Sequence, residues 1–323
     1  MDGECFGGDL ALSTRPTIDW ELAQIPQPPP VAPLTPAPRR QPPPRCLDDP
    51  RIACAVRLLE GIPAAPLGLD EVAEHVGLSP FHFQRYFQEV MGESPSAYLR
   101  RTRLDRAAMN LLMGAESVMS TALDAGYASH EAFIRAFQRR FGMVPTQYRQ
   151  FAQARRPLPT PLQREQATCV RVQVLRPQPL LAMRFHGSYT DREEYWRVFG
   201  AYLQQIGFPL QGAQLFGISL DGSLVTPTEQ IRYDCAVLDP GFDATGTALT
   251  GQALRAGRYA TLRCEGAYLP GIVNTLSSVA MAWLPNSGER LLPINNGAFE
   301  VFHRPPWEKV GGQQSFTVAL SLA

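Results

Sequence analysis

The alternation of hydrophobic and polar positions changes character twice along the chain. Between residues 46 and 154, short amphipathic segments with helical periodicity follow one another, separated by Gly and Pro signals. Beyond residue 168, runs with the two-residue period of β-strands, such as 170–174 and 233–238, alternate with helical patterns. The chain is therefore predicted to be multidomain, with an all-α domain at 46–154 and an α+β domain at 169–323.

Proline-rich segments flank the helical region. Residues 24–45 contain ten prolines, and proline lacks a backbone donor and fixes φ, so that this stretch sustains neither a helix nor a sheet ladder. We expect residues 1–45 to form a disordered Pro-rich tail. A second cluster, Pro157, Pro159 and Pro161, predicts a linker over residues 155–168.

The segment around Gly77 has the pattern of a helix-turn-helix. Residues 69–76 predict a short helix, and Gly77 supplies the turn. Ser79 is a typical N-cap and Pro80 suits the first helical position, so a second helix is expected to run to about Val90.

This segment is repeated 50 residues later. The matching positions share one offset, which predicts that a single helix-turn-helix unit is built twice, as a tandem. Ser79, Phe83, Arg85, Phe87, Gln88, Gly92, Pro95 and Tyr98 recur as Ser129, Phe133, Arg135, Phe137, Gln138, Gly142, Pro145 and Tyr148.

Each second helix is predicted to have an apolar inner face and a mixed outer face. The inner faces hold Phe83, Phe87 and Val90 or Met91, and Phe133, Phe137 and Phe141. On the outer faces, arginine can donate two hydrogen bonds to guanine, glutamine can pair with adenine, glutamate can accept from cytosine, and a ring can cover a thymine methyl. The candidate DNA-binding residues are Phe81, His82, Gln84, Arg85, His130, Glu131 and Arg135. The alternative is an ordinary solvated helix face.

A long helix is predicted between the two units, from Ser94 to about Met113. About 18 residues at 1.5 Å each span roughly 27 Å, close to the ~34 Å between successive major-groove faces of DNA. Its arginines include Arg101 and Arg103, which we predict contact phosphates. The alternative for each arginine is pairing with Asp105 and a contribution to solubility.

Composition limits the function classes. The net charge is zero, no apolar run is long enough to cross a bilayer, and the N-terminus lacks the pattern of a secretory signal, so a cytoplasmic location without membrane contact is expected. Six cysteines without a Cys-x-x-Cys pair and five histidines without metal spacing predict no metal site and no cofactor.

The C-terminal region also contains a duplication, at an offset of 79. Arg184, Gly187 and Tyr189 recur as Arg263, Gly266 and Tyr268. Helices are expected at 191–206 and 269–284, each followed by a strand pair, at 213–220 with 232–238 and at 297–303 with 315–322. Two β-α-β-β repeats facing each other would leave a cleft between them, and pockets favour such interfaces.

The helical region resembles the AraC/XylS transcription regulators. The resemblance covers residues 50–152 and is carried by the segments 77–87, 126–133 and 141–149. It implies a seven-helix module, recognition helices at 79–90 and 129–141, and binding to double-stranded DNA beside RNA polymerase. Thr121 stands where the family usually has isoleucine, which predicts looser packing of the second unit.

The C-terminal region resembles GyrI-like effector-binding domains. The clearest motif is 298–302, whose Glu300 matches a glutamate that faces the ligand in that family. A carboxylate among aromatic rings would hold a small cationic or aromatic effector. The predicted ligand-binding residues are Glu300, Tyr195, Trp196, Tyr268, Trp283 and Phe302. For the aromatic residues the alternative is ordinary core packing, and for Glu300 it is an ion pair with Arg184 or Arg263.

Three functions remain open. The leading prediction is a sequence-specific transcription regulator that senses a small molecule and has no enzymatic activity. Some GyrI-like proteins hydrolyse electrophilic small molecules with a glutamate and a tyrosine, here Glu300 with Tyr268 or Tyr259. The third possibility is a DNA-binding protein whose second domain binds a protein partner, which an exposed apolar patch would favour.

Overall fold

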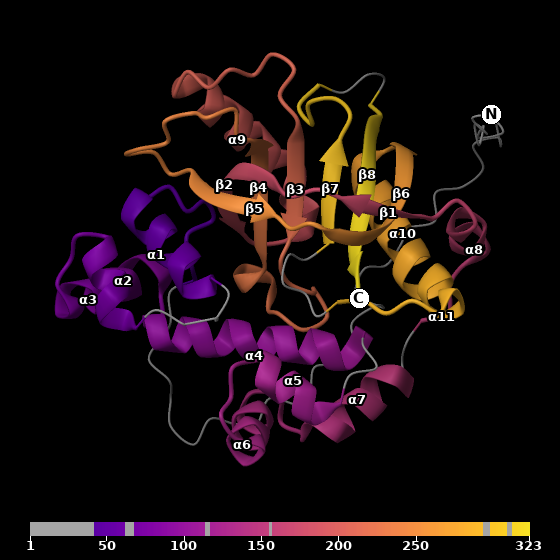
Figure 1. Cartoon of the computed structure of the whole chain (residues 1–323), viewed down its shortest axis with the longest axis horizontal. Helices are drawn as coiled ribbons and strands as arrows, with labels where there is room; N and C mark the ends of the chain where they lie inside the picture. Colours follow the sequence, from indigo (N-terminus) through magenta and orange to yellow (C-terminus); the bar gives the residue numbers. More distant parts are fainter. Residues whose placement is uncertain (1–41, 62–67, 114–116, 155–156, 293–297, 309–311) are drawn as a thin grey trace.

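The computed structural model describes residues 42–61, 68–113, 117–154, 157–292, 298–308 and 312–323. Most of the predicted tail, residues 1–41, lies outside the described residues. A helical domain and a sheet domain lie against each other, with helix α4 (Pro95–Met113) running along the boundary between them (Figure 1). The predicted order of an all-α domain followed by an α+β domain is confirmed.

The helical domain contains the seven predicted helices. These are α1 (Pro50–Glu60), α2 (Leu69–His75), α3 (Pro80–Met91), α4 (Pro95–Met113), α5 (Val118–Asp124), α6 (His130–Phe141) and α7 (Pro145–Ala154). Helix α4 connects the two helix-turn-helix units: α1 to α3 gather at one of its ends, and α5 to α7 lie along its middle and its other end (Figure 1).

The two units are built by the same local chemistry. The Ser79 hydroxyl accepts a hydrogen bond from the first turn of α3, and the Ser129 hydroxyl does the same for α6. Gly92 and Gly142 end these helices in the left-handed conformation, with φ of 70° and 73°. Phe83, Phe87 and Met91 form one core with α1 and α2, and Phe133, Phe137 and Phe141 form a second core with α4 and α5. The predicted inner faces are confirmed.

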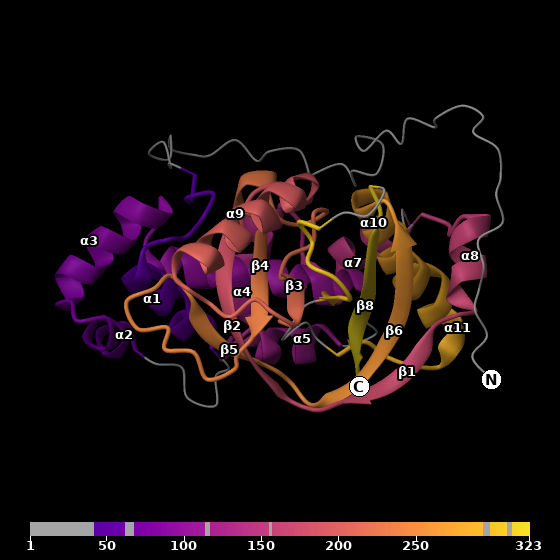
Figure 2. The same cartoon turned by 90° about the horizontal axis from the view of Figure 1, so that it is seen from above.

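The C-terminal domain is one curved antiparallel sheet of eight strands in the order β1-β6-β8-β7-β3-β4-β2-β5 (Figure 2). Its strands are β1 (Arg171–Leu175), β2 (Gln178–His186), β3 (Leu215–Ser219), β4 (Arg232–Leu238), β5 (Thr250–Leu254), β6 (Gly257–Gly266), β7 (Ala298–Phe302) and β8 (Gln314–Leu322). Helices α9 (Arg192–Gln205) and α10 (Tyr268–Ser277) pack on the sheet through one continuous hydrophobic core.

The predicted duplication is present as β2-α9-β3-β4 and β6-α10-β7-β8. Gly187 directly follows β2 and Gly266 is the last residue of β6, with φ of 132° and 150°, a conformation that favours glycine. The edge strands are exchanged, because β1 pairs with β6 of the second repeat and β5 pairs with β2 of the first. The second predicted helix is interrupted: a π-helical stretch, Ser278–Trp283, separates α10 from α11 (Leu284–Ser287).

The segment predicted as a linker contains a further helix, α8 (Pro161–Ala167). Thr160 caps it through a reciprocal capping box with Gln163. The helix packs against α10 and the π-helical stretch, and Ser278 donates a hydrogen bond to the Gln166 side chain at 2.8 Å. A proline at the first helical position thus starts a helix here instead of excluding one.

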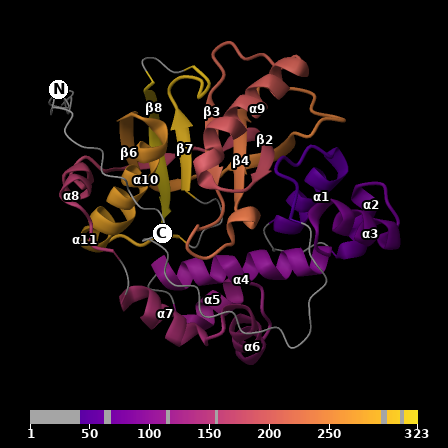
Figure 3. The same cartoon turned by 180° about the vertical axis from the view of Figure 1, so that it is seen from behind.

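A buried ion cluster joins the two domains. Glu60, the last residue of α1, accepts hydrogen bonds from Arg184 on β2 at 2.9 and 3.0 Å and from Arg232 on β4 at 2.6 Å. Burial opposes the charge on Glu60, but the two arginines outweigh it and hold its pKa well below the usual value. Figure 3 shows α1 beside β2 and α4 across the ends of the strands, so the helical domain contacts the sheet through both helices.

Candidate nucleic-acid interface and ligand cavity

Helix α3 presents a mixed polar and aromatic face to solvent. Phe81 is 80% exposed, and His82, Gln84 and Arg85 are exposed beside it. Phe83 on the opposite side of the same helix is fully buried in the core. The packing of Phe83 therefore turns this face of α3 toward solvent. The exposed face of α3 therefore carries one aromatic ring among polar side chains.

Helix α6 repeats this arrangement in the second unit. Glu131 and Arg135 are exposed, while His130 at the start of the helix is half-buried. Arg140 near the end of α6 points toward α4 instead, where its guanidinium donates to both oxygens of Asp105 at 2.6 and 2.9 Å. Gln138 and Arg139 of the third turn stay exposed, so Arg140 alone of this group turns inward.

The predicted phosphate contact of Arg101 is wrong. Its side chain is 4% exposed and donates to Glu93 at 2.8 Å, with Asp105 at 3.8 Å on the same helix. A buried arginine that is ion-paired with carboxylates is not available to DNA. Arg103 is half-buried, and its guanidinium lies against the turn at Gly126. Part of its side chain therefore remains exposed to solvent.

Thr121 fits its buried position. It is 1% exposed on α5, and its hydroxyl donates to the Ser117 carbonyl at 3.0 Å. This bond satisfies the polar group that replaces the family's usual isoleucine.

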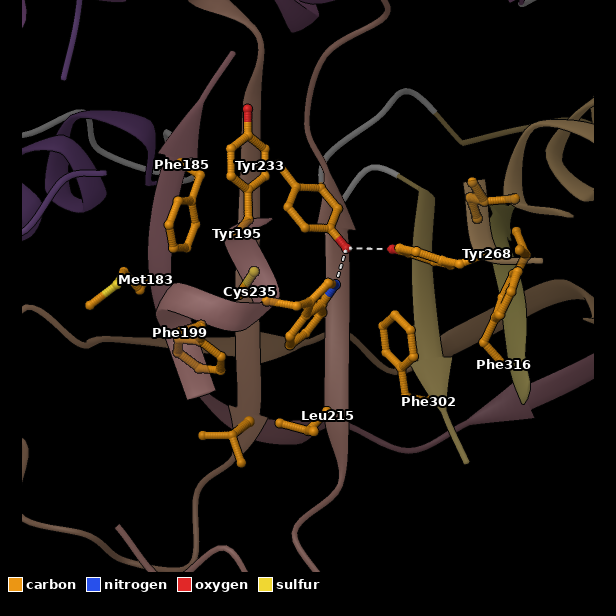
Figure 4. Close-up of a cluster of buried hydrophobic side chains, with 14 of the residues drawn as sticks. Met183, Phe185, Tyr195, Phe199, Leu215, Tyr233, Cys235, Tyr268, Phe302 and Phe316 are labelled. Carbon is orange, nitrogen blue, oxygen red and sulfur yellow. Dashed lines mark hydrogen bonds between the residues drawn. The ribbon is translucent and has the colours of Figure 1, made fainter. Parts of the chain in front are cut away.

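The predicted aromatic ligand contacts are core residues. Tyr195, Trp196, Tyr268 and Phe302 are each 4% exposed or less, and they belong to the core shared by α9, α10 and the sheet. Figure 4 shows Tyr195, Tyr268 and Phe302 in this cluster. Trp196 and Tyr268 are joined through Tyr233, whose hydroxyl lies 3.2 Å from both the Trp196 nitrogen and the Tyr268 hydroxyl. Trp283 is half-buried and packs against the same core. The ordinary core alternative is thus correct for these rings.

Glu300 is buried, and only one of its two carboxylate oxygens accepts hydrogen bonds. Tyr268 and Tyr233 donate to one carboxylate oxygen at 2.5 and 3.2 Å, and the other oxygen lies 3.3 Å from Arg192 on α9. Burial raises the pKa of Glu300, an effect that Arg192 and the tyrosines oppose. The predicted partners are wrong: Arg184 pairs with Asp234 and Glu60. Arg263 pairs with Glu265 at the surface.

A cavity of about 310 Å³ lies between the domains. Helix α4 contributes Met109, Leu112 and Met113, and α10 contributes Ile272 and Leu276. Among the residues that the structure describes, none of the six predicted ligand residues lines it, although Arg192, the partner of Glu300, does. The wall formed by α4 consists of apolar residues at 109, 112 and 113. Sequence reasoning missed this wall because it lies in the helical domain, where no ligand was expected.

The described residues contain no group of three His, Cys, Asp or Glu side chains able to hold a metal ion. Over the same residues, no helix combines the length and the apolar character that a membrane span needs. The hydrolase alternative needs a glutamate and a tyrosine that meet a substrate. Tyr268 bonds to Glu300, but both are buried outside the cavity, and Tyr259 donates to the Arg255 carbonyl instead.

Known proteins resemble the chain in two separate parts. Residues 72–150 match the family model of a helix-turn-helix domain, and residues 169–314 match that of a GyrI-like small molecule binding domain. The chain is 40% identical to the Right origin-binding protein of Escherichia coli (strain K12) over 91 residues, which are 28% of this chain and 32% of that protein. The chain thus spans about a third of the length of this relative.

Two further relatives match the helical domain. The regulatory protein SoxS of Escherichia coli (strain K12) is 37% identical over 84 residues, 26% of this chain and 78% of SoxS. A solved transcriptional regulator with an AraC-type DNA-binding domain, from Chromobacterium violaceum, is 32% identical with a TM-score of 0.30, covering 32% of this chain and 94% of that one. The matches to the Right origin-binding protein, to SoxS and to the helix-turn-helix family model favour a regulator over an enzyme. The chain belongs to the AraC-type helix-turn-helix family of transcription regulators and carries a C-terminal GyrI-like small molecule binding domain.

Proposed function

We propose that this protein binds double-stranded DNA sequence-specifically through the outer faces of α3 and α6, and that a small molecule bound by its C-terminal domain regulates transcription. The observation that carries the proposal is the pair of equivalent helices whose buried phenylalanines turn arginine-bearing faces to solvent. Arg85 and Arg135 occupy equivalent exposed positions on them. Arginine at the edge of a recognition helix is suited to guanine in the major groove.

The remaining predicted residues are of two kinds, those that contact base edges and one that contacts a phosphate. Phe81, His82 and Gln84 on α3, and His130 and Glu131 on α6, are proposed to read or cover base edges. Arg103 beside the Gly126 turn is proposed to contact a phosphate, which adds affinity without sequence information. Contact with RNA polymerase and a cytoplasmic location remain predictions from the resemblance and the composition.

Genome-scale footprinting with the purified chain tests the proposal by identifying its binding sites. On such a site, Arg135→Ala is expected to relax preference at one base pair with a loss of about 1–3 kcal/mol. Arg197→Ala is the control, because this exposed arginine on α9 lies outside the helical domain. Equal loss on every sequence for Arg135→Ala would remove the base-reading role, and an absence of protected sites would refute DNA binding.

A further inference from the structure

We propose that the cavity between α4 and the C-terminal domain binds an uncharged, largely apolar molecule, in contact with both domains at once. The proposal rests on the proposed function in taking this molecule as the effector. The residues that line the cavity indicate the class of ligand. This uncharged molecule takes the place of the cationic effector expected from the sequence.

The walls are mostly aliphatic. Leu269, Ile272, Val273 and Leu276 come from α10, and Met109 comes from α4. A volume of about 310 Å³ is within the range of small-molecule sites. Transfer of an apolar molecule from water into such a space is favourable, and the flexible methionine side chains adapt to its shape.

The charges at the cavity are already paired. Arg192, 2% exposed, lies 3.3 Å from Glu300 and donates to Ser219 at 2.8 Å. Asp221 accepts hydrogen bonds from the Arg232 side chain at 2.7 and 2.8 Å and from its backbone nitrogen at 2.8 Å. Both carboxylates are therefore paired with an arginine, and Arg232 is shared between Asp221 and Glu60.

This pairing disfavours both kinds of ion. A cation entering the cavity would meet Arg192 and find no carboxylate without a partner, so its desolvation would not be compensated. An anion would have to share Arg192 with Glu300, and two carboxylates at one arginine repel each other. An uncharged molecule meets neither cost.

The wall from α4 makes the site depend on the arrangement of the two domains. Met109 packs so closely on Gly222 of the sheet domain that a Cβ there would lie 2.1 Å from the Met109 sulfur. Any side chain at residue 222 would push the domains apart or displace the methionine. A ligand in the cavity thus contacts the helix that connects both helix-turn-helix units.

The test uses the full-length chain and the fluorescence of N-phenyl-naphthylamine as an uncharged apolar probe. Three compounds of similar shape then compete with it: para-tert-butylphenol, para-hydroxyphenyl-trimethylammonium and para-tert-butylbenzoate. We expect the phenol to compete at least about tenfold more tightly than the cation or the carboxylate, in line with the cost of an uncompensated charge. Equal or tighter competition by the cation would overturn the proposal.

Substitutions locate the binding. Met109→Trp fills the cavity from α4 and is expected to lower probe affinity at least about tenfold. Met119→Trp is the matched control, because Met119 is 51% exposed on α5 and does not line the cavity. If Met109→Trp and Met119→Trp bind the probe equally well, the proposed site is wrong.

Removing the paired arginine tests the charge argument. Arg192→Gln leaves Glu300 without its cation, so preference is expected to shift toward para-hydroxyphenyl-trimethylammonium, and Arg192→Gln with Glu300→Gln is expected to restore preference for the phenol. Unchanged selectivity in a folded Arg192→Gln variant would contradict the proposal. Probe binding without any protected DNA would refute the proposed function while leaving the ligand class supported.

Discussion

The Thr226 hydroxyl donates to the Asp105 carboxylate across the domain boundary at 3.3 Å, and that carboxylate also holds Arg140 of α6. Thr226 follows the segment 221–224, which lines the cavity. Its neighbour Val225, 8% exposed, belongs to the hydrophobic core of the second helix-turn-helix unit. One short segment of the sheet domain, residues 221–226, therefore lines the cavity and also contacts Asp105 and the core on which α6 packs.

Thr226→Val tests the strength of this connection. Valine keeps the shape of threonine but removes the donor, so we expect the free energy of unfolding to fall by about 1 kcal/mol in urea denaturation. Thr228→Val, at an exposed threonine two residues later, is expected to change stability by less than about 0.5 kcal/mol. If the two variants lose the same stability, the bond to Asp105 contributes nothing.

Arg101→Ala is expected to act on the fold and not on DNA directly. The substitution leaves the buried Glu93 without its cation, and breaking such a pair costs about 3–5 kcal/mol. Thermal unfolding should show a large decrease in Tm, and Arg101→Met with Glu93→Gln should recover part of it. A stable Arg101→Ala variant with uniformly weakened DNA binding would restore the phosphate contact predicted from the sequence.

Gly77 and Gly126 provide a matched pair at the turns of the two units. Their φ angles are 69° and 76°, so alanine at either is expected to cost about 1–2 kcal/mol in unfolding free energy. A Cβ at Gly126 would also lie 3.2 Å from the Arg103 guanidinium, whereas nothing lies within 4 Å of one at Gly77. The Arg103 guanidinium must therefore shift by a few tenths of an ångström in Gly126→Ala.

The consequence is a difference in DNA affinity. If Arg103 contacts a phosphate, folded Gly126→Ala should bind DNA more weakly than folded Gly77→Ala on every sequence, with a shallower salt dependence. Titration at two salt concentrations measures both quantities. Identical binding by the two variants would remove Arg103 from the contacts.

His186 makes stability depend on pH. The ring is 2% exposed and its Nδ1 lies 2.9 Å from the Pro44 carbonyl. Burial, assisted by Arg184, lowers the pKa of His186 from 6.5 to about 3. The folded pKa is below the unfolded one, so protons favour the unfolded chain, and stability is complete above about pH 6.5 and is lost as the pH falls toward 3.

This residue alone should remove about 2 kcal/mol of unfolding free energy between pH 7 and about pH 5. Urea denaturation at both pH values measures the loss, which His186→Gln should abolish. His75→Gln, at an exposed histidine of α2, is the control. An unchanged pH dependence in His186→Gln would show that other groups are responsible.

Local patterns were sufficient for much of the fold. The serine caps, the spacing of Phe83 and Phe87, and the repeat at an offset of 50 predicted α3 and α6 nearly to the residue, because capping and helical periodicity act over one or two turns. The duplication of the C-terminal domain was found in the same way. The exchange of β1 and β5 between the repeats was not, because pairing between distant strands leaves little local signal.

The sequence by itself determined helices α3 and α6, which side of each faces solvent, and the presence of two β-α-β-β repeats. Only the tertiary structure decided which charges find partners: Arg101 turns to Glu93, Glu300 to Arg192, and Glu60 to arginines of the other domain. Hydrophobic periodicity reports burial one element at a time. The partner of a buried charge, and the cavity between α4 and the sheet domain, depend on how distant elements are brought together.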